Sequence, residues 1–166
     1  MVLDRKIAFI DLTAGMTKSQ SISLDLRRKF LGGRGLNMVL LSRFYGRDLD
    51  PLSPANPLIF GAGLLSGTLG FGARLNITAK SPESGHLGDS NVGGQFAAEL
   101  VKAGFSHLVI TGKSPKPAYL FIKDGEIEIR SAEGLWGLDT YETQKRIRSD
   151  SGDDKTQIAC IGPAGE

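Results

Sequence analysis

The chain has 166 residues, with 20 Lys and Arg against 18 Asp and Glu, so its formal net charge at pH 7 is only +2. This length fits one domain, because a chain near 150 residues buries roughly two-thirds of its unfolded surface. The weak, evenly spread charge disfavours nucleic acid and membrane surfaces as partners. The single cysteine, Cys160, excludes an internal disulfide and falls short of the four thiolates that a cubane iron-sulfur cluster usually needs.

The hydropathy pattern predicts a protein that stays in the cytoplasm. The longest apolar runs, such as residues 58–65, are too short to span a bilayer. The N-terminus also lacks the long apolar segment and the cleavage site of a signal peptide.

The first quarter of the chain predicts a hairpin followed by two helices. Strands are expected at Ile7–Leu12 and Gln20–Leu24, around a turn that contains glycine. Asp25 can cap a short helix toward Phe30, which the Gly-Gly-Arg-Gly run at 32–35 breaks. Apolar residues at helical spacing predict a second helix over Leu36–Phe44.

The middle of the chain predicts a buried strand and then a strand-to-helix joint. The unbroken apolar run Leu58–Ala62 is typical of a buried strand, and Leu75–Ala79 predicts another. A polar loop over Ser81–Gly94 then leads into a helix. This joint gathers one arginine, two asparagines and a glycine pair, and backbone amides at a helix N-terminus favour an anionic ligand.

The last third predicts four strands and one helix, and pattern alone therefore indicates an α+β domain. An Asp-Gly pair at 124–125 is a strong hairpin signal, so three of the strands are expected to be adjacent. Asp139 or Thr140 can cap the helix. The expected elements are strands at His107–Thr111, Ala118–Lys123, Glu126–Arg130 and Gln157–Ile161, and a helix through Arg148.

Arg74 is the first candidate binding residue. It follows Gly70-Phe71-Gly72-Ala73, a glycine-rich approach that lets backbone come close to a ligand, and its guanidinium is a planar fork that suits phosphate. From the residues alone, a surface arginine at the start of a strand is favoured by roughly two to one, because such glycine-arginine patterns occur widely by chance.

Asn91, Gly93 and Gly94 are candidates at the end of the polar loop. Small residues leave room for a bulky ligand, and an amide side chain offers both a donor and an acceptor. Helix capping by Ser90 or Asn91, worth about 1 kcal/mol, is an equally good interpretation. Asp89 and Ser90 could help to hold a metal ion, although a single carboxylate in a polar loop is usually just solvated.

Arg34 is a weaker candidate than Arg74. The glycines around it could form a backbone nest for an anion. Their spacing fits neither a dinucleotide-binding fingerprint nor a phosphate-binding loop of the Walker type. A structural turn between two helices is therefore the better interpretation of residues 32–35.

No side chains form a recognisable catalytic set. His86 and His107 have no Cys or carboxylate at ligand spacing, which disfavours zinc. No serine has the setting of a hydrolase nucleophile, and no carboxylate pair stands out as a general acid and base. Cys160 is expected to be a small buried strand residue, and Trp136 an interface or core aromatic.

Several motifs together resemble the N-terminal domain of the aldehyde ferredoxin oxidoreductase family. The resemblance implies a four-layer α/β/β/α domain over residues 1–166, built from two related halves with mixed sheets. Family members are several times longer, so the chain is expected to be one domain or a truncated product. The motifs, in the family's order, are GGRGLN at 32–37, PLSPANPLIFGAG at 51–63, the run at 71–105 and IGPAGE at 161–166.

The resemblance also implies an activity and cofactors. Such enzymes oxidise aldehydes to carboxylic acids at a tungsten, or molybdenum, bis-pterin centre, and pass electrons through a [4Fe-4S] cluster to ferredoxin. Arg74 matches a pterin-contacting arginine, which reverses the preference for a plain surface residue. Asn91 and Gly93, with Gly94 beside them, match positions at the cofactor near a magnesium ion that bridges pterin phosphates. Arg34 lies in a motif that the family retains close to the cofactor.

The expected partners are the remainder of the enzyme, ferredoxin and an aldehyde substrate. The chain is expected to be inactive alone, and exposure of its contact surface would favour a homo-oligomer. Three alternatives stay open: a natural small subunit of a split enzyme, a non-catalytic binding module for pterin or another phosphate-bearing ligand, and a structural domain. The choice of aldehyde, and of tungsten over molybdenum, is open.

Overall fold

The computed structural model describes residues 5–44, 46, 48–68 and 72–165. Its strands are β1 (Lys6–Asp11), β2 (Met16–Ser21), β3 (Leu58–Ala62), β4 (Leu75–Lys80), β5 (Leu87–Val92), β6 (Phe105–Thr111), β7 (Ala118–Lys123) and β8 (Glu126–Ser131). Its helices are α1 (Leu24–Phe30), α2 (Gly33–Ser42), α3 (Phe96–Lys102) and α4 (Thr140–Ser151), with a short 3-10 turn at Pro163–Gly165.

The strands of the described residues form one mixed sheet, in the order β2-β1-β6-β3-β4-β5, and a separate β7-β8 hairpin. The pair β1-β6 is parallel, and the other neighbours are antiparallel. Both edges of β6 are thereby used, by β1 and by β3. The prediction that β6 would lie beside β7 and β8 is wrong for this reason.

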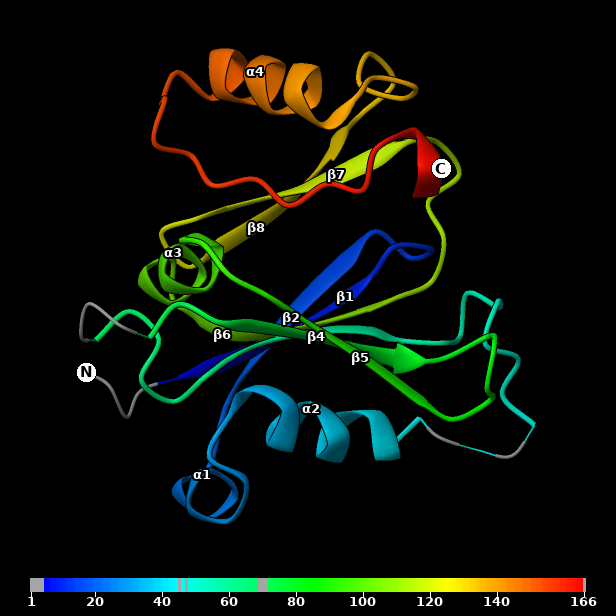
Figure 1. Ribbon diagram of the computed structural model, residues 1–166, viewed down its shortest axis with the longest axis vertical. Coiled ribbons are helices and arrows are strands. Elements are labelled where there is room, and N and C mark those ends of the chain that lie inside the picture. Colours follow the sequence, from blue (N-terminus) through cyan, green and yellow to red (C-terminus); the bar gives the residue numbers. More distant parts are fainter. Residues whose placement is uncertain (1–4, 45, 47, 69–71, 166) are drawn as a thin grey trace.

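The layers confirm the α+β class and the four-layer arrangement. Figure 1 shows α1 and α2 on one face of the large sheet, the β7-β8 hairpin on its other face, and α4 beyond the hairpin. Alternate residues of β1 serve the two faces: Ile7 and Phe9 pack toward the helices, whereas Ala8 and Ile10 pack toward the hairpin. Because a strand has a period of two, both faces of the sheet can be buried at once.

The second strand lies earlier than predicted, at β2 and not at Gln20–Leu24. Asp11 closes the turn, because its Oδ1 accepts hydrogen bonds from the backbone N–H groups of Thr13 at 2.9 Å and Ala14 at 3.0 Å. This turn pairs Asp11 with Met16. All six residues of β2 are exposed at the sheet edge, so the apolar residues that suggested a later strand were misleading.

The two N-terminal helices also begin earlier than predicted. Ser23, and not Asp25, caps α1, with its Oγ accepting from the Leu26 N–H at 3.3 Å. The helix α2 starts inside the Gly-Gly-Arg-Gly run, at Gly33, whose φ of 50° favours glycine. A Cβ on Gly32 would lie 3.1 Å from the Ala62 carbonyl oxygen. Close backbone packing therefore accounts for Gly32, whereas residues 33–35 belong to α2 and do not form the expected turn between two helices.

The predicted loop over Ser81–Gly94 contains a strand, and this is the correction that matters most for the site. Residues 87–92 form β5, which pairs with β4 along its whole length. The helix α3 begins only at Phe96, after Gln95, so capping by Ser90 or Asn91 is wrong. The predicted joint is a hairpin whose second strand leads through two glycines into a short helix.

The C-terminal third follows the prediction except near its end. The β7-β8 turn has Asp124 at φ 51° and Gly125 at φ 87°, and Asp139 caps α4 through the N–H groups of two following residues. Residues 157–161 pair with no strand of the described chain, and Cys160 is exposed. Trp136 is 58% exposed, so it is not a core residue.

Candidate functional site

The β4-β5 hairpin brings three predicted binding residues to one end of the large sheet. Asn76 lies opposite Asn91, and Leu75 opposite Val92 is the last pair of the ladder. Arg74 directly precedes that pair and Gly93 directly follows it. Asn76 lies on the face of β4 that packs on α2, and Arg74 stands one residue before the strand begins.

Asn76 collects oxygen atoms of β5 around its amide nitrogen. Its Nδ2 donates to Asp89 Oδ2 at 3.1 Å, to the Ser90 carbonyl at 3.1 Å and, more weakly, to Asn91 Oδ1 at 3.3 Å. Asn76 is only 4% exposed. One buried amide therefore fixes the positions of three oxygens on the more exposed strand.

Asn37 supports Asn76 from beneath, and it is fully buried on α2 at 0% exposure. Its Nδ2 donates to Asn76 Oδ1 at 3.0 Å, to the Asn76 carbonyl at 3.1 Å and to Thr78 Oγ1 at 3.1 Å. Its Oδ1 has no hydrogen-bond partner among the residues that the structure describes, and it faces Gly61. Such an orphaned atom costs stability, about 1–3 kcal/mol, so a strong local demand must hold it there.

Arg34 closes this arrangement at the surface. Its Nε donates to Asp89 Oδ2 at 2.8 Å, and the two side chains form an ion pair with exposures of 58% and 17%. The hydrogen bond from Arg34 holds the pKa of the Asp89 carboxyl below its usual value, while partial desolvation opposes this and Asn76 adds to it. We call Asn37, Asn76, Asp89 and Arg34 the amide cluster.

The end of the hairpin beside the amide cluster is open. Arg74 is exposed and makes no ion pair with any residue in the described ranges, although Gly70 and Phe71 before it lie outside them. A Cβ built on Gly93 or Gly94 would meet no described atom within 4 Å. The described atoms therefore leave the space beside these two glycines open, next to the exposed guanidinium of Arg74.

The described residues offer no cluster of the side chains that most often bind metals. In the described part of the chain, no group of three or more His, Cys, Asp and Glu residues could hold a metal ion. The family resemblance places Asn91 near a metal ion, and the contact of its Oδ1 with Asn76 is the longest of the three at 3.3 Å. An amide oxygen suits a hard cation such as magnesium, which is usually bound by few protein ligands.

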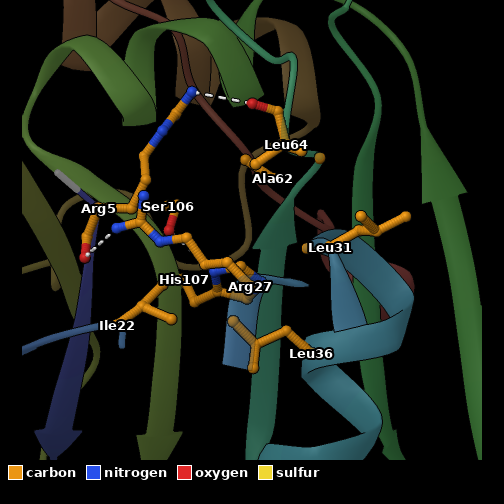
Figure 2. A pocket seen from close by; sticks show the side chains of 11 residues that line it. Arg5, Ile22, Arg27, Leu31, Leu36, Ala62, Leu64, Ser106 and His107 are labelled. Atoms are coloured by element: carbon orange, nitrogen blue, oxygen red, sulfur yellow. Dashed lines mark hydrogen bonds between the residues drawn. The ribbon is translucent and has the colours of Figure 1, made fainter. Parts of the chain in front are cut away.

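A second polar group lies beneath the same face of the sheet, and Figure 2 shows it around a small cavity. Arg5 Nη2 donates to the carbonyls of Leu64 at 3.2 Å and Ser66 at 3.0 Å, and Arg27 Nη2 donates to the Arg5 carbonyl at 3.2 Å. The cavity volume is about 10 Å³, which is room for about one water. These residues therefore tie β1 to α1 and to the loop after β3, and a pterin does not fit.

His107 belongs to this second group and is 1% exposed. Its Nδ1 lies 3.0 Å from Ser106 Oγ. Burial lowers the pKa of His107 to about 4, which the Gly33 backbone partly opposes and the charges of Arg5 and Arg27 reinforce. The imidazole is therefore neutral at pH 7. We call Arg5, Arg27 and His107 the arginine cluster.

The sequence did not single out Asn37 or the role of Asn76. One signal was present, because Asn37 stands between Leu36 and Leu40-Leu41 on the apolar face of a helix. Asn76 and Thr78 likewise alternate with Leu75 and Ile77 in a strand. Polar residues at positions that periodicity assigns to the core are usually hydrogen-bonded to each other.

A scan against family models matches residues 7–166 to the aldehyde ferredoxin oxidoreductase N-terminal domain. The chain is 45% identical over 158 residues to the tungsten-containing aldehyde ferredoxin oxidoreductase of Pyrococcus furiosus, covering 95% of this chain and 26% of that protein. The enzyme of the same name from Thermococcus kodakarensis is 43% identical over the same coverage. The chain thus spans about a quarter of the length of these relatives.

The fold of this chain is also similar to part of a solved structure. The active-site complex BamBC of benzoyl coenzyme A reductase, in complex with 1,5-dienoyl-CoA, superimposes with a TM-score of 0.92 at 35% identity. The match covers 96% of this chain and 25% of that one. Within the described residues, no helix is long and apolar enough to cross a membrane.

Proposed function

The chain belongs to the aldehyde ferredoxin oxidoreductase N-terminal domain family, and we propose that it holds a tungsten bis-pterin cofactor in an enzyme that oxidises aldehydes to carboxylic acids. The observation that carries the proposal is the open end of the β4-β5 hairpin, where Arg74, Asn91 and Gly93 lie together. Relatives more than 40% identical are named as tungsten-containing enzymes, which supports tungsten over molybdenum.

Each residue of the open end has a distinct role in this proposal. Arg74 binds a pterin phosphate through its planar fork. Gly93 and Gly94 would let the cofactor approach the backbone, and Asn91 would offer its side-chain oxygen to a magnesium ion. Arg34 adds positive charge nearby while Asp89 holds it. The bound group supplies the two-electron redox chemistry, and the chain supplies binding and orientation.

The remaining parts of the activity belong to sequence beyond this domain. Cys160 is the single cysteine of the chain, so we place the [4Fe-4S] cluster and the contact with ferredoxin in the remainder of the enzyme. The similar structure is named for a reductase of benzoyl coenzyme A, a different substrate class. A domain shared by both kinds of enzyme is a cofactor support, and the aldehyde is selected elsewhere. We expect the chain alone to be inactive, and the enzyme to be cytoplasmic.

The test is the tungsten and pterin content of the intact protein that contains this chain, purified anaerobically from its source. We expect both in stoichiometric amounts. Arg74→Ala should lose most of the bound cofactor with little change in thermal stability, because Arg74 is exposed. Arg28→Ala, which removes an exposed arginine on α1, is the matched control and should retain it. Unchanged tungsten in Arg74→Ala would contradict the proposed site.

A further inference from the structure

Two backbone carbonyls, which can only accept hydrogen bonds, determine which way the side-chain amide of Asn37 points in the amide cluster. Asn37 Nδ2 faces the Asn76 carbonyl at 3.1 Å and, at 3.4 Å, the Ile59 carbonyl. Carbonyl oxygens only accept, so Asn37 must present its NH₂ group and leave its own oxygen without a partner. The two carbonyls therefore fix the orientation of the Asn37 amide.

The orientation of the Asn37 amide in turn determines the orientation of the Asn76 amide. Asn76 Oδ1 accepts from Asn37 at 3.0 Å and from Thr78 Oγ1 at 2.8 Å. With its oxygen occupied on the buried side, Asn76 must turn its NH₂ group toward β5. Three oxygens of β5 then face one amide, and two of them belong to the side chains of Asp89 and Asn91.

We propose that Asn76, held by Asn37, is a positioning residue for the cofactor site, which fixes the Asn91 and Asp89 oxygens before the cofactor arrives. This inference rests on the proposed function, since it concerns the same end of the hairpin. β5 is an edge strand, and residues 89–92 are exposed. Without the amide of Asn76, Asp89 keeps only its contact with Arg34 and Asn91 loses the hydrogen bond that fixes its side chain, so binding must order both side chains.

The positioning also determines where Arg34 points. Asp89 Oδ2 accepts from Arg34 and from Asn76 at once, so Asn76 holds the carboxylate that holds the guanidinium. The buried amide of Asn76 thus positions the Asn91 oxygen for a cation and, through Asp89, the Arg34 guanidinium for an anion. Asn76 itself touches neither ligand in this scheme and acts through its neighbours.

The experiment measures the first-order rate of tungsten loss from the intact protein during dialysis, together with pterin content and thermal stability. The variant is Asn76→Asp, which keeps the oxygen that Asn37 and Thr78 require but replaces the NH₂ donor with an oxygen. The control is Asn56→Asp. Asn56 also donates through Nδ2 to two carbonyls, at 2.8 and 3.0 Å, and accepts from the Lys80 N–H at 3.1 Å, at the opposite end of β4.

We expect Asn76→Asp to lose tungsten and pterin at least about tenfold faster than the native protein, the size typical when a supporting partner of a metal site is removed. Asn56→Asp should lose them at the native rate even if it is equally destabilised. Asn76→Ala, which adds no charge, should lose them as fast as Asn76→Asp and gives the same answer if the aspartate variant does not accumulate.

The two proposals fail in different ways. Native release rates in both Asn76 variants, alongside rapid loss from Arg74→Ala, would overturn the positioning role and leave the proposed function intact. A release rate that follows thermal stability across all variants, Asn56→Asp included, would also overturn it, because that is the behaviour of a purely structural residue. A native protein without tungsten and pterin would remove the proposed function itself.

Discussion

The amide cluster and the arginine cluster lie on the same face of the large sheet, yet they end differently. In the amide cluster, exposure rises step by step, from 0% at Asn37 and 4% at Asn76 to a side-chain exposure of 58% at Arg34. In the arginine cluster, the hydrogen bonds of Arg5 and Arg27 end on backbone carbonyls around a cavity of about 10 Å³.

The difference separates two uses of buried polar groups. A network that ends on backbone carbonyls joins parts of the fold, and removing a member should cost mainly stability. A network that ends at exposed side chains can orient them for a ligand. Removing one of its outer members should therefore weaken mainly ligand binding and change stability little. Four changes test this division. The first two alter buried residues, one at each cluster, where both clusters should lose mainly stability.

The largest effect is expected for Gly61→Ala, at the buried end of the amide cluster. A Cβ there would overlap the Asn37 amide, which is fixed by several hydrogen bonds. Overpacking and lost buried hydrogen bonds together should lower the free energy of unfolding by about 4 kcal/mol. Urea denaturation measures this. Gly134→Ala, where a Cβ meets no described atom within 4 Å, is the control and should change little.

Arg5→Met should be next, at about 3 kcal/mol. The substitution keeps an apolar stem but leaves the buried Ser66 carbonyl and the half-buried Leu64 carbonyl without the donor that Arg5 supplies. Denaturation of the variant measures the loss, with Arg28→Met on the exposed side of α1 as the control. Tungsten release from the folded variant should stay native. Faster release at native stability would erase the distinction between the clusters.

His107 should give the arginine cluster a pH dependence. Its pKa is lowered from 6.5 to about 4 by burial, so between those values the unfolded chain binds a proton that the folded chain does not. The free energy of unfolding is therefore at its full value above pH 6.5. It falls by roughly 3 kcal/mol as the pH drops toward 4, because the unfolded chain takes up the proton first. Urea denaturation at several pH values, compared with His107→Gln, isolates this slope. Parallel curves for the two proteins would show that His107 does not titrate as described.

The smallest stability effect is expected for Arg34→Gln. The Arg34–Asp89 pair is largely exposed on the arginine side, and such pairs contribute about 0.5 kcal/mol, less at high salt. Tungsten release should nevertheless accelerate, because a positive charge beside the cofactor is lost. A loss of more than about 2 kcal/mol would instead place Arg34 with the structural residues.

The fold was predictable where local chemistry decides it. The apolar run of β3 and the Asp-Gly turn of β7-β8 gave correct boundaries from sequence, and Asp139 was a correct cap. β5 was missed because its Gly88-Asp89-Ser90-Asn91 core has low strand propensity. Pairing with β4 overrides that propensity, and an edge strand needs no apolar face.

The site was predictable in part. Arg74, Asn91 and Gly93 lie together, but a hairpin register gathers them and not the N-terminus of a helix. Their roles at a cofactor stay predictions. Asn37 and Asn76 are 39 residues apart, and their contact exists only once α2 has packed on β4. A local sequence pattern cannot predict such a long-range contact. Polar residues at core positions indicate only that each of them needs a hydrogen-bond partner.

The parallel pairing of β1 with β6 has a consequence for how the protein is made. Lys6 lies opposite Phe105, so β1 waits for about 100 further residues to be synthesised before its neighbour β6 is available. At 5–20 residues per second, that wait is roughly 5–20 seconds. Throughout this interval the edge of β1 that later pairs with β6 has no strand beside it. Nascent chains are therefore most exposed to chaperones and to misassociation before residue 111 has emerged.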